Sequence, residues 1–393
     1  MSLTPELIHW LQEKEAAAWL PGLTASPPDD AALLATLLHL RKHVAPHKAA
    51  ALVTQARLRY QARKKFGAQA ATLFFTATHL QQASPPAVAR HIANRYTKHP
   101  IVADLGCGMG ADSLALAART EQILAIDQDP LAVSLTQANA RASHLHHRIH
   151  PIQADILQPA WHTDTAWADP GRRQQDSRRI FHPQALQPPL AALLKLQNSS
   201  IPHMGIKLMP GLPHQHIPPQ AETEWISLNG QLKEAVLWLG NLAQHPGQRR
   251  ATLLPAGLSL YAHHAPAVVR APGSHLYEPD PAIIRAGAVS DLAQHLGLWQ
   301  LDEQIAYLSG AQIAASPWAR TWRILEHFPF DLKHLNRRLR ALGAQVEAVK
   351  KRGSPIQPEP FRKRLYRRKQ GRSVVVILTR VHDRAWMLIT ERE

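Results

Sequence analysis

The stretch from Ile101 to Asp129, IVADLGCGMGADSLALAARTEQILAIDQD, decides how this chain folds. A short apolar run ends at Asp104, and a turn follows that has glycine at three alternate positions, Gly106, Gly108 and Gly110. A helical pattern and a second apolar run, which ends at Asp127, come next. Glycine carries no Cβ, so such a turn lets the backbone approach a ligand closely. The order of strand, turn, helix and strand predicts the first βαβ unit of a nucleotide-binding α/β sheet.

The acids at the two strand ends indicate the kind of cofactor. Asp127 lies about 20 residues past the turn, where a carboxylate accepts ribose hydroxyls. Asp104 lies two residues before the first glycine, where it would repel a pyrophosphate but suit an ammonium group. The glycines also fit the dinucleotide fingerprint G-x-G-x-x-G/A, so a nicotinamide cofactor is the alternative.

The string DLGCGMGAD resembles motif I of the class I S-adenosylmethionine (SAM) methyltransferases. In that family the first acid and the glycine loop hold the methionine end of SAM, and the acid after the second strand holds the ribose. The fold also keeps a polar residue near the adenine after the third strand; here that position is Asp155, for which capping of a turn is the alternative. The resemblance implies SAM as the cofactor, held by Asp104, Gly106, Cys107, Gly108, Gly110, Asp127 and Asp155.

The segment Thr165 to Arg173, TAWADPGRR, predicts the fourth strand and the chemistry at its end. Asp169 follows an apolar run at the edge of the sheet where α/β proteins bind ligands, which makes it the candidate catalytic residue. Amine-directed nucleic-acid methyltransferases have Asp/Asn-Pro-Pro-aromatic here, whereas this chain has Gly171 and Arg172, so a stacked, flipped base is not indicated. The element also resembles that of the RNA uridine C5-methyltransferases, which need a cysteine nucleophile; Cys107 lies in the cofactor loop instead, which excludes that chemistry.

Cationic side chains near this edge are candidates for substrate binding. Arg172 and Arg173 are suited to a phosphate, because guanidinium groups bind it in a bidentate way. Lys207 follows from the next apolar run, Met204 to Leu208, and either contacts substrate or extends to solvent. Lys350, Lys351 and Arg352 form a basic loop near the C-terminus.

Composition and charge point to a nucleic-acid partner. The net charge is +16, and residues 331–372 alone hold a surplus of 11 positive charges. Clustered positive charge of this kind is expected where a protein binds an RNA or DNA backbone. The alternative is a charged surface that only keeps the protein in solution. One cysteine excludes an internal disulfide and fits a cytoplasmic protein. The 24 histidines show no metal-ligand spacing, and no apolar run is long enough to span a membrane.

The order of motifs predicts four parts: a helical N-terminal domain (1–95), a SAM-binding Rossmann-like domain (96–262), a helical connector (263–321) and a small basic α+β module (322–393). Helical patterns around 291–298 and 302–308 support the connector. The series DLGCGMGAD, ADPGRR, IKLMPG, LYEPDPAIIRAG and VKKRGSPIQPEPFRKRL resembles the bacterial class I SAM methyltransferases that carry a THUMP-like domain. That resemblance implies a module likened to THUMP RNA-binding domains.

The preferred interpretation is therefore a SAM-dependent methyltransferase that acts on RNA, such as tRNA or rRNA. Asp169 would orient the acceptor or take its proton. A methyltransferase of a small molecule or protein is one alternative. An RNA-binding protein that has lost catalysis is another.

Overall fold

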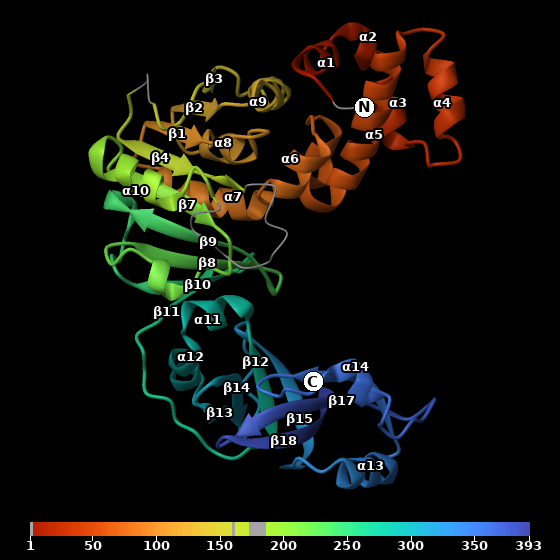
Figure 1. The fold of residues 1–393 in the computed structure, drawn as a ribbon, viewed down its shortest axis with the longest axis vertical. Coiled ribbons are helices and arrows are strands. Elements are labelled where there is room, and N and C mark those ends of the chain that lie inside the picture. The colour runs from red at the N-terminus through yellow and green to blue at the C-terminus, as the bar shows by residue number, and fades with distance from the viewer. Residues whose placement is uncertain (1–2, 159–161, 173–185) are drawn as a thin grey trace. The chain divides into compact units, whose positions relative to one another are not determined.

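The computed structural model describes residues 3–158, 162–172 and 186–393 (Figure 1). The chain forms two compact units: Met1–Glu222 with Ala235–Gly247, and Thr223–Glu234 with Gln248–Glu393. The boundary passes through strands β8 (Glu222–Leu228) and β9 (Gln231–Leu239). No helix in the described ranges combines the length and apolar composition needed to cross a membrane.

The first unit is built on a sheet with the strand order β3-β2-β1-β4-β7-β9. Its parallel strands are β1 (Ile101–Leu105), β2 (Gln122–Asp127), β3 (Ile149–Gln153), β4 (Thr165–Ala168) and β7 (His203–Leu208). Strand β9 runs antiparallel to β7. Residues 102–105 and all of β4 are buried, as expected for central strands of a parallel sheet. Helices α8 (Ala111–Leu116), α9 (Pro130–Ala142) and α10 (Leu190–Ser199) complete the α/β arrangement.

The predicted βαβ unit is confirmed as β1, α8 and β2. Asp104 is the last residue but one of β1, and Asp127 is the last residue of β2. The two strands pair in parallel, with Asp104 opposite Ala125 and Leu105 opposite Ile126. Their carboxyl ends therefore reach the same edge of the sheet, together with that of β4, which pairs with β1 on its other side.

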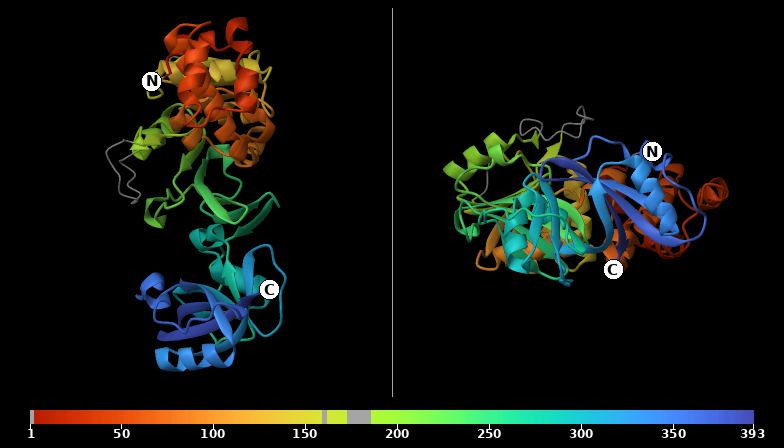
Figure 2. Two further views of the ribbon diagram at one scale, coloured as in Figure 1. Left: turned by 90° about the vertical axis from the view of Figure 1, so that its right-hand side faces the viewer. Right: turned by 90° about the horizontal axis from the view of Figure 1, so that it is seen from below.

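The N-terminal residues are helical, as predicted. The helices are α1 (Pro5–Trp10), α2 (Lys14–Ala17), α3 (Leu20–Ala25), α4 (Leu33–Leu40), α5 (Pro46–Phe66), α6 (Ala77–Gln82) and α7 (Pro86–Ala93). In Figures 1 and 2 the helices α1 to α6 gather in one group; α1 contacts α9, and α7 contacts α8. One apolar core joins Trp10, Leu52 and Phe75 of this region to Leu135 and Ala138 of α9. The N-terminal helices therefore share a core with α9 within the first unit.

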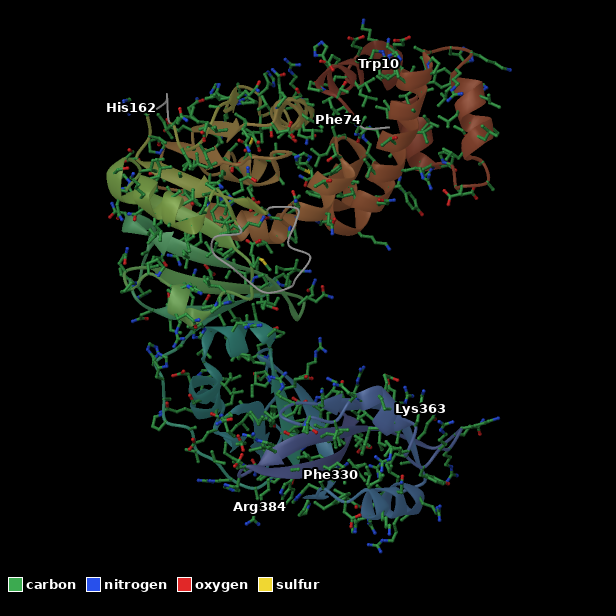
Figure 3. All side chains as sticks on the ribbon, viewed as in Figure 1. Trp10, Phe74, His162, Phe330, Lys363 and Arg384 are labelled. Carbon is green, nitrogen blue, oxygen red and sulfur yellow. The ribbon has the colours of Figure 1, made fainter. Side chains whose placement is uncertain are left out.

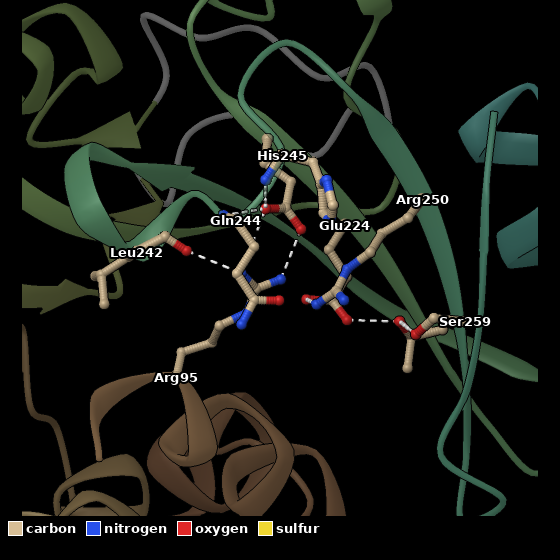
Figure 4. Close-up of polar contacts among 9 residues, drawn as sticks. Arg95, Glu224, Leu242, Gln244, His245, Arg250 and Ser259 are labelled. Carbon is tan, nitrogen blue, oxygen red and sulfur yellow. Dashed lines mark hydrogen bonds and ion pairs between the residues drawn. The ribbon is translucent and has the colours of Figure 1, made fainter. Parts of the chain in front are cut away.

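Two buried carboxylates of β8, Glu222 and Glu224, each form an ion pair with an arginine (Figure 4). In the first unit, Arg95 Nη2 lies 2.6 Å from Glu222 Oε1, and Glu222 Oε2 accepts hydrogen bonds from the backbone amides of Gln244 and His245. In the second unit, Arg250 Nη2 lies 2.6 Å from Glu224 Oε2. Buried carboxylates are tolerated because each has a cation and further donors within hydrogen-bond distance.

The second unit contains β8, β10 (Arg249–Leu254) and β11 (Leu258–Tyr261), and a seven-stranded sheet ordered β13-β14-β12-β15-β18-β17-β16. Its strands are β12 (His275–Pro279), β13 (Trp299–Asp302), β14 (Ile305–Gly310), β15 (Ala319–Pro329), β16 (Ala344–Lys351), β17 (Arg372–Val381) and β18 (Arg384–Arg392). The helices are α11 (Pro281–Ala286), α12 (Val289–Leu296), α13 (Leu332–Ala341) and α14 (Pro358–Arg362).

The expectation of a helical connector over 263–321 needs correction. Helices α11 and α12 are present, but residues 302–308, expected to be helical, form the end of β13, a turn and most of β14. Strand β12 pairs with both β14 and β15, so this segment is part of the C-terminal sheet. Pairing with strands distant in sequence outweighs the local helical pattern of a short apolar run.

The predicted α+β pattern at the C-terminus is confirmed. Strand β17 alternates between two apolar faces: Val374, Val376 and Leu378 face the core with α13 and α14, while Val375 and Ile377 face the core with β12 to β14. The turn at His382 and Asp383 has both residues at positive φ, and it joins β17 to β18. Lys363, labelled in Figure 3, is among the exposed side chains of this part.

Candidate functional site: the glycine loop and the ends of three strands

The glycine loop after β1 has a backbone that requires glycine. Gly106, Gly108 and Gly110 have φ values of 85°, 56° and 79°. A Cβ on Gly106 would lie 2.8 Å from the backbone carbonyl oxygen of Asp169. The loop that follows β4 therefore lies directly against the glycine loop, so the two segments singled out in the sequence form one site.

Asp104 is a buried carboxyl group with an unused oxygen. Its side chain is 1% exposed, and its Oδ2 accepts a hydrogen bond from the Ser113 hydroxyl. Its Oδ1 has no hydrogen-bond partner among the described residues. Burial, followed by repulsion from Asp112, raises the pKa of Asp104 to about 8. An ammonium group beside Oδ1 would stabilise the ionised form, so this position fits the amino group of SAM.

Asp127 lies at the other side of the loop. Its Oδ2 accepts a hydrogen bond of 3.0 Å from the backbone N–H of Gly108, and its Oδ1 accepts one of 3.0 Å from that of Asp129. Each carboxylate oxygen can accept a further hydrogen bond, so both remain suited to ribose hydroxyls. The backbone of the loop and the ribose-binding candidate are thus held together by a direct contact.

Two other predicted cofactor residues have local structural contacts. Asp155 is exposed and accepts hydrogen bonds from Leu157 N, at 2.9 Å, and from Gln158 Nε2, at 3.3 Å, which is the turn-capping alternative. Cys107 is buried and lies 3.5 Å from the Thr136 hydroxyl. Burial raises the pKa of the Cys107 thiol well above its usual range, so it is not a nucleophile.

Asp169 meets Lys207 at the ends of β4 and β7. Lys207 Nζ donates hydrogen bonds to Asp169 Oδ2 at 2.7 Å and to the hydroxyl of Ser84 at 2.9 Å. The Asp169 side chain is 30% exposed, so an acceptor can reach it. The structure therefore brings together two residues that the sequence singled out separately.

Sequence reasoning missed two members of this cluster. Asp112 Oδ2 accepts hydrogen bonds from Ser84 Oγ at 3.3 Å and from the indole N–H of Trp167 at 3.2 Å, and it lies 3.9 Å from Lys207 Nζ. Asp112 directly follows the glycine motif, which was an available signal. Ser84 comes from the helical N-terminal region, and nothing in its local pattern marks it.

The predicted substrate-binding arginines follow Asp169 in the chain. Arg172 lies in the short strand β5 (Gly171–Arg172), which pairs with β6 (Leu186–Gln187). Arg173 lies outside the described residues. No group of three or more His, Cys, Asp or Glu side chains with metal-binding geometry occurs in the part of the chain that the structure describes.

The predicted basic loop at 350–352 requires a correction, because Lys350 and Lys351 are the last two residues of strand β16. Lys350 Nζ lies 2.5 Å from Glu278 Oε2 and over the ring of Trp322, and Arg352 Nη2 lies 3.8 Å from Glu278 Oε1. These two cations are half-buried and share the single Glu278 carboxylate, which β12 brings beside them and which offsets one of their two charges. Lys351 alone of the three is exposed.

Exposed positive charge gathers on α13, at the end of β16, on α14 and in the segment before β17. The exposed residues are Lys333, Arg337, Arg340, Lys351, Arg362, Lys363, Arg364, Arg367, Arg368 and Lys369. The structure records no ion pair for any of them within the described ranges. Arg338 and Arg372, by contrast, pair with Glu326 and Glu391.

The sheet, the positive-φ glycine loop and the acids at the ends of β1 and β2 define a class I methyltransferase. Family profiles agree: residues 102–168 match a methyltransferase domain, and residues 319–392 match a "THUMP domain-like" family. A protein of Mycobacterium tuberculosis named as a SAM-dependent methyltransferase is 33% identical over 311 residues, which cover 78% of this chain and 84% of that protein.

A solved structure described as a methyltransferase of Porphyromonas gingivalis W83 has the same fold. It superposes with a TM-score of 0.76 at 18% identity, covering 99% of this chain and 97% of the other. This chain belongs to the SAM-dependent methyltransferases and carries a THUMP-like domain at its C-terminus. Its cofactor is SAM, which supplies an electrophilic methyl group.

Proposed function

We propose that the protein methylates RNA. The observation that carries this proposal is the exposed basic surface of the THUMP-like module, where cations gather without recorded intramolecular ion pairs. Lysine and arginine on such a surface bind phosphates independently of sequence. A methyltransferase unit joined to a module of this kind is suited to a large polyanionic substrate.

The acceptor site has the groups that methyl transfer needs from the protein. Lys207 neutralises the Asp169 carboxylate and fixes its direction, so Asp169 is suited to orient the acceptor through a hydrogen bond or to take its proton. Asp112 and Ser84 position Lys207 in turn. Asp104, the glycine loop and Asp127 hold the cofactor.

The proposed domain organisation assigns a separate role to each part of the chain. Residues 96–262 carry the cofactor and acceptor sites, the helices of 1–95 cover them, and 322–393 retain the RNA. Residues 263–321 extend the sheet of the RNA-binding part. A reducing compartment, the cytoplasm, suits RNA modification by a protein with one buried thiol.

The test uses purified full-length protein, SAM carrying a labelled methyl group, and total RNA from cells that lack the gene. Labelled nucleosides identified by mass spectrometry after digestion support the proposal, and the labelled RNA species names the substrate. Label that appears only in protein or small molecules overturns the RNA assignment. Salt-sensitive RNA binding with no transfer to any substrate would indicate a protein that has lost catalysis.

A further inference from the structure

His79 of α6 lies against the cofactor loop, although it is about 30 residues away in the sequence. Its ring carbon Cδ2 is 3.4 Å from the position that a Cβ on Gly108 would occupy. The N–H of the same glycine donates to Asp127. The imidazole and the ribose-binding carboxylate therefore flank one residue of the loop.

The helix that carries His79 is held in place. Thr76 caps α6 by accepting a hydrogen bond from the His79 backbone N–H, and its hydroxyl lies 2.7 Å from His79 Nδ1. At the other end, the Lys65 ammonium donates to the carbonyl oxygens of Leu80, Gln81 and Ala83. Two residues past the helix, Ser84 bonds to Lys207. The segment from Thr76 to Ser84 is thus fixed at both ends beside the site.

The state of the ring suits a neutral polar ligand. Burial lowers the pKa of His79, and the carboxylates of Asp129 and Asp127 only partly offset this effect. The ring is therefore neutral at neutral pH. With Nδ1 bound to Thr76, Nε2 remains as the second polar atom, and the structure records no hydrogen bond to it from the residues it describes. A hydroxyl group can donate to or accept from Nε2, whichever tautomer is present.

We propose that His79 is a cofactor-binding residue that contacts the ribose of SAM from the side opposite Asp127. The helical N-terminal region then completes the cofactor site as well as covering it. Asp127 and His79 together bind the ribose from two elements that are separated in sequence, with Gly108 between them.

The test measures binding of S-adenosylhomocysteine and of its analogue with a 2′,3′-dideoxyribose, by calorimetry on full-length protein. His79→Ala should raise the Kd for S-adenosylhomocysteine about tenfold, the effect of one lost hydrogen bond, and leave the Kd for the dideoxy analogue unchanged. His79→Asn, which keeps a polar group, should recover part of the loss. Gln82→Ala, at an exposed position on the same helix, is the matched control and should change neither Kd.

Three results would overturn the proposal. An equal loss for both ligands would mean that His79 only packs against Gly108, and an unchanged Kd in His79→Ala would mean that it does not touch the cofactor. Failure of the unaltered protein to bind S-adenosylhomocysteine would overturn the cofactor site itself. The melting temperature of each variant, measured without ligand, separates lost contacts from lost folding.

Discussion

Replacing Asp104 with asparagine should stabilise the cofactor-free protein while weakening SAM binding. Asp104 has a pKa of about 8 in the folded protein, against 3.8 for an aspartate exposed to water. The folded state therefore binds a proton that the unfolded state releases, and this carboxyl group lowers stability as pH rises from 3.8 to 8. At pH 7 the cost is about 4 kcal/mol, from about 1.4 kcal/mol per pH unit.

Asparagine does not ionise, so it removes this cost. Its oxygen can accept from Ser113 as Asp104 does, but its amide N–H₂ takes the place of Oδ1 and is left without a partner, which costs about 1–3 kcal/mol. The net gain in the free energy of unfolding should be about 1–3 kcal/mol at pH 7. It should vanish near pH 5 and stay constant above pH 8.

The assay is urea unfolding at pH 5, 6, 7 and 8 at fixed ionic strength, following the transition that SAM shifts in the unaltered protein. SAM should stabilise Asp104→Asn much less, because the ammonium group loses its carboxylate. Asp155→Asn makes the same chemical change at an exposed position and is the matched control for urea unfolding. A difference between Asp104→Asn and the unaltered protein that does not change with pH would refute the reasoning.

Three further predictions concern the acceptor, the loop and the RNA-binding surface. Asp169→Asn should lower the single-turnover methylation rate by at least about 100-fold with little change in SAM affinity, because the ion pair with Lys207 and the acceptor contact are both lost. Gly106→Ala should cost more than about 2 kcal/mol of stability and abolish SAM binding, measured by thermal melting with and without SAM, because its Cβ would meet the Asp169 carbonyl oxygen at positive φ. Reversing the charges of Arg362, Lys363 and Arg364 should weaken RNA binding. The slope of the logarithm of the binding constant against the logarithm of salt concentration should become less negative by about 0.7–0.9 for each lost phosphate contact.

Each of these predictions has a matched control. Asp164→Asn changes the residue just before the opposite end of β4 and should retain the rate. Gly22→Ala, in α3, introduces a Cβ that has no atom within 4 Å, so it should leave the melting temperature unchanged or raise it. Reversal of the exposed Arg41 and Lys42 should leave RNA binding unchanged. Charge reversal is preferable to removal of the module, because β12 pairs with β15 in one sheet and a cut near residue 320 would expose the edge of that sheet.

A normal rate in Asp169→Asn would remove that residue from the reaction. Tight SAM binding by Gly106→Ala would mean that the loop does not approach the cofactor as its backbone implies. The contrary result for RNA is that charge reversal in the module leaves RNA affinity and its salt dependence unchanged while reversal at Arg41 and Lys42 alters them. That result would mean that the N-terminal helices bind the RNA.

The sequence by itself determined the class of this protein. The glycines at 106, 108 and 110 and the acids at 104 and 127 are local features, because backbone conformation and strand ends depend on neighbouring residues. The α+β character of the C-terminal module was equally readable, and the continuous apolar run 374–378 is typical of a strand buried on both faces.

Only the tertiary structure decided which side chains meet. Lys207 pairs with Asp169 across 38 residues, His79 reaches the site from α6, and Ser84 reaches it from the loop that follows α6; no local pattern marks either residue. Glu278 forms ion pairs with Lys350 and Arg352 because β12 joins the C-terminal sheet. No local pattern over 263–321 indicates that β12 pairs with β15. Contacts between residues far apart in sequence depend on how whole elements pack, so one sequence shows the candidate groups but not their partners.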